Sequence, residues 1–148
     1  MADSVIEIDC DRQRLDLAFV HSFLVRAHWS KGIPFATMLR AIEHSLPFGL
    51  YKDGKQIGFA RVVTDHATFA YLADVFVIEG ERGKGYGKRL VEAVLAHPAV
   101  QGLRRWMLVT RDAEHLYRPF AFTDPRQTHK VLERLNFTSY ESDAQTAA

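Results

Sequence analysis

Cysteine, long apolar runs and an excess of one charge are all missing from this sequence. A single cysteine, Cys10, stands among 148 residues, so no disulfide can form within the chain. The apolar runs fall well short of the roughly 20 residues that a membrane-spanning helix needs. No positively charged leader followed by an apolar stretch precedes the first predicted element. These absences predict a cytoplasmic protein without disulfides and without a membrane partner.

The charges are nearly balanced, which excludes other classes. Nineteen basic residues face 18 acidic ones, a formal charge of +1, so the global basic excess of a nucleic-acid-binding protein is missing. The histidines show no metal-ligand spacing, and the HExxH pattern is absent, so we expect no metal. Ser45 follows His44 but lacks the GxSxG elbow of a serine hydrolase. Any anion site must therefore be local.

What remains is the composition of an ordinary globular protein. Hydrophobic residues make up 47% of the chain and charged residues 25%. The length suits one domain with a continuous core, so we predict a single domain over residues 1–148. Residues 141–148 are expected to form a flexible tail.

The first half of the chain predicts a strand, two helices and a hairpin-connected sheet. Val5 to Ile8 favours a short strand, and apolar residues recur at helical intervals over residues 15–27. Pro34 suits the first turn of a second helix that extends to about residue 46. Residues 48–78 predict three antiparallel strands. The last of these strands is apolar on both faces, which indicates a central strand covered on both sides.

The second half predicts a glycine loop followed by alternating short elements. A helix with an apolar stripe begins near Tyr86 and ends before Pro98. A strand is expected at residues 106–110, followed by a short helix that Asp112 can cap. Residues 129–135 fit either a strand or a helix, and we favour a strand.

The glycine loop is the strongest functional signal. A predicted strand passes through Arg82-Gly83-Lys84-Gly85-Tyr86-Gly87-Lys88 into a helix, where backbone amides converge on the positive end of the helix dipole. The nucleotide-triphosphate pattern fails because Arg89 follows Gly87-Lys88, and the dinucleotide pattern GxGxxG lacks its third glycine. A glycine-rich turn without a ligand is the alternative. The loop predicts a site for a diphosphate.

Three segments together resemble a known family. Arg82-x-x-Gly85-x-Gly87 resembles the central motif of the Gcn5-related N-acetyltransferase (GNAT) family, which reads Arg or Gln, two residues, Gly, one residue, Gly or Ala. The strand Leu72 to Val77 is similar to the family's fourth strand. Residues 116–122 resemble its LYxxxGF segment, with Ala121 in place of the usual glycine.

The resemblance covers the chain from about Val5 to Leu135 and implies a fold and a co-substrate. The implied class is α/β (α+β), the GNAT acyl-CoA N-acyltransferase fold, with a mixed, mostly antiparallel sheet flanked by helices. The implied co-substrate is acetyl-CoA, held by loop amides at its diphosphate and by exposed strand backbone at its pantetheine. Asp112 is placed near the pantetheine, although helix capping explains it equally well. The implied cofactor-binding residues are Val75, Phe76, Val77, Arg82, Gly83, Lys84, Gly85, Tyr86, Gly87, Lys88 and Asp112.

Two residues are candidates for proton transfer. Tyr117 stands at the position of the family's general acid, and a phenol with a reference pKa of about 10 stays protonated at pH 7. An amphipathic core tyrosine is the alternative. Asp74 interrupts an apolar strand, which makes it a candidate base or a binder of a cationic acceptor. Its alternative is a structural carboxylate paired with Arg61 or capping a loop.

The acceptor side is implied by the resemblance alone. His28, Trp29, Ser30 and Phe35, with Asp74, would line the substrate mouth, unless Trp29 only fills the loop between two helices. The predicted function is direct transfer of the acetyl group from acetyl-CoA to a primary amine of a small molecule. The alternatives are a protein or peptide N-acetyltransferase and a non-catalytic acyl-CoA sensor. A homodimer is common among such proteins, but no interface can be predicted here.

Overall fold

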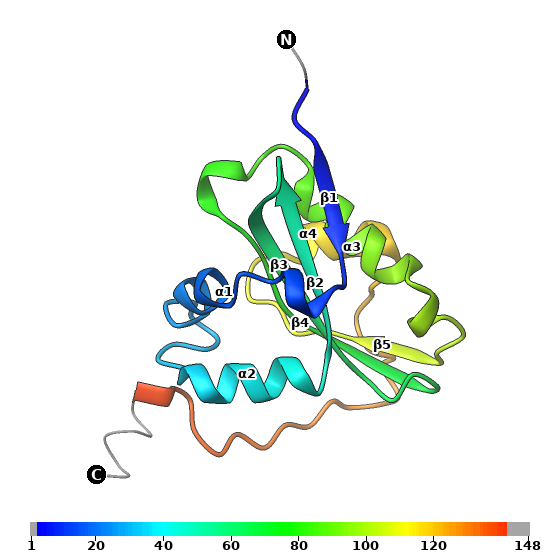
Figure 1. The fold of residues 1–148 in the computed structure, drawn as a ribbon. Coiled ribbons are helices and arrows are strands. Elements are labelled where there is room, and N and C mark those ends of the chain that lie inside the picture. Colours follow the sequence, from blue (N-terminus) through cyan, green and yellow to red (C-terminus); the bar gives the residue numbers. More distant parts are fainter. Residues whose placement is uncertain (1–2, 142–148) are drawn as a thin grey trace.

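The computed structural model describes residues 3–141 and shows one five-stranded sheet with helices on both faces (Figure 1). The strands lie in the order β1-β2-β3-β4-β5 and are antiparallel except for the parallel pair β4 and β5. Their bounds are β1 (Ile6–Asp9), β2 (Leu46–Lys52), β3 (Lys55–Thr64), β4 (Phe69–Val77) and β5 (Arg105–Met107). The helices are α1 (Leu17–Leu24), α2 (Phe35–Glu43), α3 (Tyr86–Ala96) and α4 (Glu114–Tyr117), with short 3-10 helices η1 (Arg12–Arg14), η2 (Glu79–Glu81), η3 (Pro98–Val100) and η4 (Arg118–Phe120). The predicted fold class and the three antiparallel strands are confirmed.

The sheet has a hydrophobic cluster on each face. One cluster joins the sheet to α3 and α4, and the other joins it to α1 and α2 (Figure 1). Strand β4 contributes Leu72 to the first cluster and Phe76 to the second. This confirms the prediction of a central strand covered on both sides.

Helix starts follow local chemistry. Asp16 caps α1, because its carboxylate accepts the Phe19 amide at 3.0 Å. Pro34 precedes α2 as its N-cap and not as a residue of its first turn. Gly85 precedes α3 with a φ of 83°, a left-handed conformation that glycine adopts without steric cost.

Arg12 supports the end of α2. Its guanidinium donates hydrogen bonds to the carbonyl of Ile42, in the last turn of α2, and to that of Ser45, just beyond the helix. We expect Arg12→Ala to lower the free energy of unfolding by about 2 kcal/mol, because two carbonyls lose a charged donor. Arg118→Ala, which removes exposed ion pairs to Glu114 and Asp124, should cost clearly less, because water screens exposed ion pairs. Urea denaturation checks both values, and equal losses would contradict this role for Arg12.

Strand β4 contains a β-bulge at the centre of the molecule. Phe59 pairs with Phe76 and Arg61 pairs with Ala73, so Asp74 and Val75 together lie opposite one residue of β3. Asp74 has a φ of 55°, which is costly for a residue other than glycine and is tolerated best by Asp and Asn. The bulge lies a few residues beyond Tyr71, which forms the last pair of β4 with β5.

The gap between β4 and β5 begins earlier along β5 than the sequence predicted. The predicted strand at residues 106–110 is shorter, since β5 spans Arg105–Met107 and its pairing to β4 ends at Tyr71 and Met107. Beyond this pair the two strands separate. The backbone of residues 108–110 therefore leaves the sheet and borders the opening.

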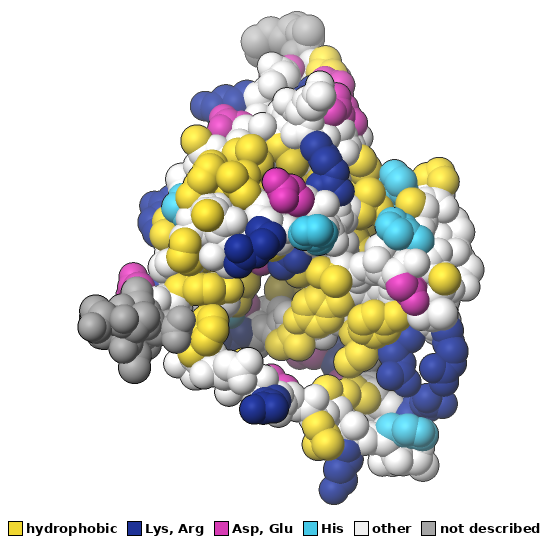
Figure 2. All heavy atoms as spheres, turned by 60° about the horizontal axis from the view of Figure 1, so that its bottom comes forward, with side chains coloured by type: hydrophobic (Ala, Val, Ile, Leu, Met, Phe, Trp, Pro, Cys, Tyr) yellow, Lys and Arg dark blue, Asp and Glu magenta, His cyan; other side chains and the backbone are white. Residues whose placement is uncertain are grey.

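The prediction of a strand at residues 129–135 is wrong, and no helix forms there either. Within residues 123–139, the described chain pairs with no strand, and several apolar side chains are exposed, including Val131, Leu132 and Leu135. A strand needs partners for its backbone groups, and an apolar pattern alone cannot supply them. Figure 2 shows hydrophobic side chains around a hollow on one face of the molecule. Most of the predicted tail, residues 142–148, lies outside the described residues.

No helix in the range 3–141 has the length and apolar character that crossing a membrane requires.

Candidate active site

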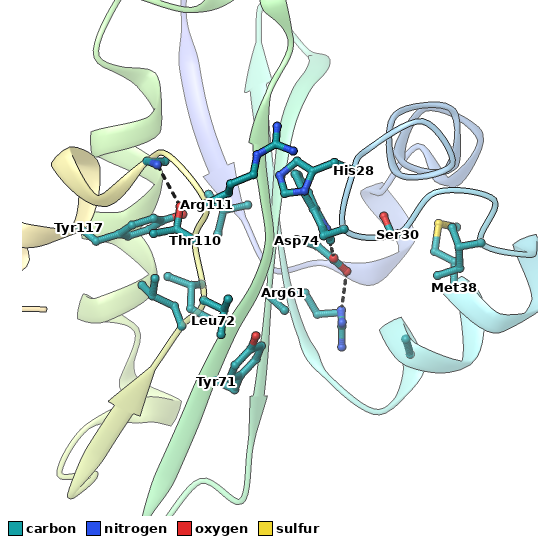
Figure 3. A pocket seen from close by; sticks show the side chains of 18 of the residues that line it. His28, Ser30, Met38, Arg61, Tyr71, Leu72, Asp74, Thr110, Arg111 and Tyr117 are labelled. Carbon is teal, nitrogen blue, oxygen red and sulfur yellow. Dashed lines mark hydrogen bonds and ion pairs between the residues drawn. The ribbon is translucent and has the colours of Figure 1, made fainter. Parts of the chain in front are cut away.

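A cavity of about 500 Å³ opens where β4 and β5 separate. Its walls come from the loop between α1 and α2, from α2, from β3 and β4, and from the chain that joins β5 to α4. Figure 3 shows Tyr117 and Asp74 on opposite sides of β4. A group held between the strands would therefore meet the phenol from one side and the carboxylate from the other. Polar lining residues include His28, Ser30, Arg61, Asp74, Asp112 and Tyr117.

Both oxygens of the Asp74 carboxylate are hydrogen-bonded. The indole N–H of Trp29 donates to Oδ1 at 2.8 Å, and Nε of Arg61 donates to Oδ2 at 2.9 Å (Figure 3). Arg61 also donates to the hydroxyl of Ser45 at 3.1 Å. The pairing of Asp74 with Arg61 was one of the alternatives that the sequence left open, and it is observed. The bond from Trp29 was not predicted.

Tyr117 is a buried phenol that faces the cavity. Its side chain is 8% exposed, and its ring lies edge-on to Phe122 with centroids 6.0 Å apart. Burial raises the pKa of Tyr117 to about 12, because the phenolate is poorly solvated there. Among residues 3–141 its hydroxyl has no hydrogen-bond partner. The phenol is thus protonated at neutral pH and free to donate.

Asp112 does not cap α4. The residue that precedes the helix is Ala113, and its amide donates to the hydroxyl of Thr110 at 3.0 Å. The Thr110 hydroxyl thus accepts from the N-cap residue itself, and no side chain of the described residues caps α4. Asp112 instead borders the cavity. Its side chain is 77% exposed, and its Oδ2 lies 4.0 Å from Nε of Arg111.

The glycine loop has free amides. Within the described chain, no backbone N–H of residues 83–88 donates a hydrogen bond, whereas the flanking amides of Arg82 and Arg89 do. Gly83 and Gly85 have φ values of 77° and 83°, and a Cβ on either would meet nothing within 4 Å. The loop therefore combines a row of amides that have no acceptor within the described chain with glycines whose surroundings are open.

Side chains around the loop hold it in place. Nε of Arg82 donates to the Val77 carbonyl at 2.9 Å, so this side chain braces the loop against the end of β4. Lys52 and Lys84 both contact Glu81, at 2.9 and 3.0 Å, and their hydrogen bonds lower the pKa of its carboxyl. A Cβ on Gly87 would lie 3.7 Å from the Leu116 side chain, so the start of α3 packs beside α4, which carries Tyr117.

The remaining predicted residues divide into two groups. Val75, His28, Trp29 and Ser30 line the cavity, although the Ser30 hydroxyl donates to the Leu24 carbonyl at 2.7 Å. Phe35 lies outside the cavity and packs edge-on against His21 with centroids 5.3 Å apart.

Phe76 and Val77 are buried in the hydrophobic clusters on opposite faces of the sheet. The Phe76 ring stacks on Phe23 with centroids 3.8 Å apart. Only their backbone is left to face a ligand. Their predicted contacts with pantetheine therefore concern main-chain atoms alone.

Sequence reasoning missed several lining residues. Tyr71 shares a strand face with Ala73, and the alternation of β4 could have indicated that both face the α1–α2 side. Burial raises the pKa of Tyr71, and the nearby Asp74 raises it further. Met38 and Tyr140 carried no comparable signal, because helix packing and a long irregular segment bring them to the cavity.

Comparison with known proteins decides the family. The sequence model of the acetyltransferase (GNAT) family matches residues 13–122, which include the loop, the bulge and Tyr117. The chain belongs to the acetyltransferase (GNAT) family. The resemblance predicted from three motifs is confirmed, and so is the enzyme class.

Individual relatives agree with this family. A crystal structure of a GNAT-family acetyltransferase from Xanthomonas campestris pv. campestris is 48% identical, with a TM-score of 0.85, and covers 88% of this chain and 93% of that one. A Gibberella zeae protein with an acetyltransferase name is 31% identical, but the match spans only 61% of its length and 60% of this chain. An aminoglycoside N-acetyltransferase solved with CoA is 20% identical, with a TM-score of 0.69, covers 92% of this chain and 98% of that one, and shows the shared fold alone.

Proposed function

We propose that the protein transfers the acetyl group of acetyl-CoA directly to a primary amine of a small molecule. The observation that carries this proposal is one cavity between β4 and β5 that presents a carboxylate, Asp74, and a protonated phenol, Tyr117. Membership of the GNAT family supports acetyl-CoA as the donor. Asp74 lies below the surface with its side chain 13% exposed, which favours a small acceptor over a folded protein.

The donor would be held by backbone. The six unpaired amides of residues 83–88 suit the diphosphate of CoA, because amides at a helix start stabilise anions. Lys84 and Lys88 add positive charge to the same loop. The pantetheine would follow the backbone of residues 75–77 into the gap between the strands, near Asp112. This path brings the thioester to the bulge.

The chemistry then requires two proton transfers. The amine nitrogen attacks the thioester carbonyl carbon and gives a proton to Asp74, directly or through water. A backbone amide near Phe76 stabilises the negative oxygen of the tetrahedral intermediate. As the carbon–sulfur bond breaks, the Tyr117 hydroxyl gives its proton to the CoA thiolate, and solvent returns the Asp74 proton to Tyr117. The products are an N-acetyl amide and CoA.

The alternatives are separable by two measurements. Calorimetry with acetyl-CoA reports binding, and a thiol assay reports CoA release with small amines or with lysine peptides. An enzyme of the proposed kind releases CoA only when a small amine is present. Saturable binding without release for any acceptor would indicate a sensor, and release only with peptides would indicate a protein acetyltransferase.

Gly85→Ala tests the loop. The substitution should weaken acetyl-CoA binding by about tenfold, because its methyl group adds bulk beside the unpaired amides and strains a left-handed residue. Gly102→Ala is the matched control, since Gly102 has a φ of 74°, an equally open Cβ position and no place in the loop. Calorimetry should show weaker binding for Gly85→Ala alone. Equal affinities in the two variants would contradict the diphosphate site.

A further inference from the structure

The charges that line the cavity balance each other. They comprise two arginines, Arg61 and Arg111, and two aspartates, Asp74 and Asp112. Arg61 and Asp74 form a close ion pair at 2.9 Å inside the cavity, where both side chains are less than one-fifth exposed. Arg111 and Asp112 lie 4.0 Å apart at the rim, where both side chains are mostly exposed and water screens them. The interior thus offers no uncompensated charge to a ligand.

The carboxylate and guanidinium inside the cavity are held by hydrogen bonds to each other and to their neighbours. Trp29 and Arg61 each donate to one oxygen of Asp74, and Arg61 donates further to Ser45. A second ammonium group on an acceptor would need a carboxylate of its own, and a ligand carboxylate would need a free cation. The ion pair of Asp74 with Arg61 leaves neither a net negative nor a net positive charge for such a group, although each Asp74 oxygen can still accept one more hydrogen bond from the reacting amine. A charged substituent buried here would therefore lose its hydration without a full replacement.

Apart from the uncharged polar side chains of Ser30 and Thr37 and the imidazole of His28, the rest of the acceptor side is aromatic and apolar. The Trp29 indole is fixed by its bond to Asp74, and its ring also packs edge-on against His28, with centroids 5.0 Å apart. Rings and aliphatic side chains stabilise an apolar ligand body through buried area and ring packing. The apolar and aromatic residues on this side are Trp29, Ile33, Met38, Ala41, Tyr71 and Tyr140.

We propose that the acceptor is a monoamine on an aromatic or apolar body, of the arylalkylamine class, with no second charged group. This inference rests on the proposed acetyl transfer. A cavity with balanced charge does not favour the ammonium form over the free amine, and the free amine is the nucleophile. Arg61 is then a specificity-determining residue, because it neutralises Asp74 and so keeps diamines and polyamines out.

Matched pairs of amines test the inference. 2-Phenylethylamine and phenylalanine differ by a carboxylate, and butylamine and 1,4-diaminobutane differ by a second ammonium. We expect kcat/KM to be at least about tenfold higher for 2-phenylethylamine than for phenylalanine, and for butylamine than for 1,4-diaminobutane. Calorimetry of the same amines with the CoA-bound protein should give the same order. A preference for phenylalanine or for the diamine in these measurements would overturn the inference.

Failure of the proposed function has a different signature. It would show as saturable acetyl-CoA binding with no CoA release for any of the four amines. In that case the affinities of the four amines for the CoA-bound protein still test the proposed acceptor class. Tighter binding of 2-phenylethylamine and butylamine than of their charged counterparts would support the monoamine class. The reverse order, or no binding of any of the four, would overturn it.

Arg61 variants give a second test. Arg61→Met leaves the Asp74 charge unpaired, so the ratio of kcat/KM for 1,4-diaminobutane over butylamine should rise by about tenfold or more. Arg61→Lys keeps the positive charge and should keep the wild-type preference. Thermal melting establishes that both variants fold. An unchanged ratio in folded Arg61→Met, or the same rise in Arg61→Lys, would contradict the role of Arg61.

Discussion

Tyr117→Phe is expected to slow CoA release by about 100-fold while leaving the Kd for acetyl-CoA within about twofold of wild type. The phenol faces the cavity with its pKa raised to about 12, so at neutral pH it is a donor with no competing partner in the described chain. Phenylalanine keeps the ring and its contact with Phe122 but has no proton to give. Steady-state thiol release and calorimetry measure the two quantities.

The pH dependence separates acid catalysis from packing. Above the pKa of a thiol, about 8.5, the CoA thiolate is a stable leaving group and needs no proton. The deficit of Tyr117→Phe should therefore shrink between pH 7 and pH 10. A deficit that stays constant over this range would instead indicate a packing role for the ring.

Tyr51→Phe is the matched control for burial. Tyr51 is 1% exposed, and burial raises its pKa to about 12 as well, but it lies outside the cavity. Its hydroxyl is buried without a hydrogen-bond partner among the described residues, so its removal should leave or raise stability. Activity of Tyr51→Phe should equal that of wild type. If Tyr51→Phe lost as much activity as Tyr117→Phe, the loss in Tyr117→Phe could not be assigned to proton donation, because removing a buried hydroxyl elsewhere would have the same effect.

Asp74→Asn is expected to lower kcat/KM for the amine by about 100-fold, with acetyl-CoA affinity preserved. Asparagine tolerates the left-handed backbone that this position requires and can still accept the Trp29 bond, so the bulge should remain. What is lost is the carboxylate that receives the amine proton and balances Arg61. Initial rates over a range of amine concentrations measure the effect.

High pH should partly rescue this variant. As the pH rises, more of the amine is in its free form, and hydroxide can accept the proton that the amine nitrogen loses after its attack, which in the wild type goes to Asp74. A purely structural carboxylate would give a deficit that does not depend on pH. Loss of acetyl-CoA binding in Asp74→Asn would also count against the proposed role, because it would point to a collapsed cavity.

The glycine loop and the helix after it could be predicted from the sequence because their signals are local. Gly85 adopts a left-handed conformation at a strand-to-helix junction. The motif that predicts this turn, Arg82, Gly85 and Gly87, lies within six residues. The apolar stripe of α3 and the two-sided pattern of β4 are likewise short-range signals. Loop, helix and central strand were therefore predicted with nearly correct bounds.

The acceptor side depends on contacts between distant parts of the chain. The bond from Trp29 to Asp74 joins residues 45 positions apart, and Tyr140 reaches the cavity from the far end of the described chain. Phe35 was expected at the substrate mouth, but the turn of α2 directs it toward His21. Periodicity specifies which face of an element is buried, and it does not specify what that face meets.

The failed strand at residues 129–135 has a related cause. Its apolar residues fit a strand pattern, but β5 pairs with β4 over only three residues and offers a short edge. Strand formation depends on such a partner as much as on the segment itself.

Product analysis with acetyl-CoA and 2-phenylethylamine tests the central claim most directly. Mass spectrometry of the quenched reaction should show N-acetylated amine and free CoA in equal amounts, both rising only when protein and amine are present together. CoA release at the same rate with and without amine, or saturable acetyl-CoA binding with no N-acetylated product from any primary amine, would contradict acetyl transfer in this cavity.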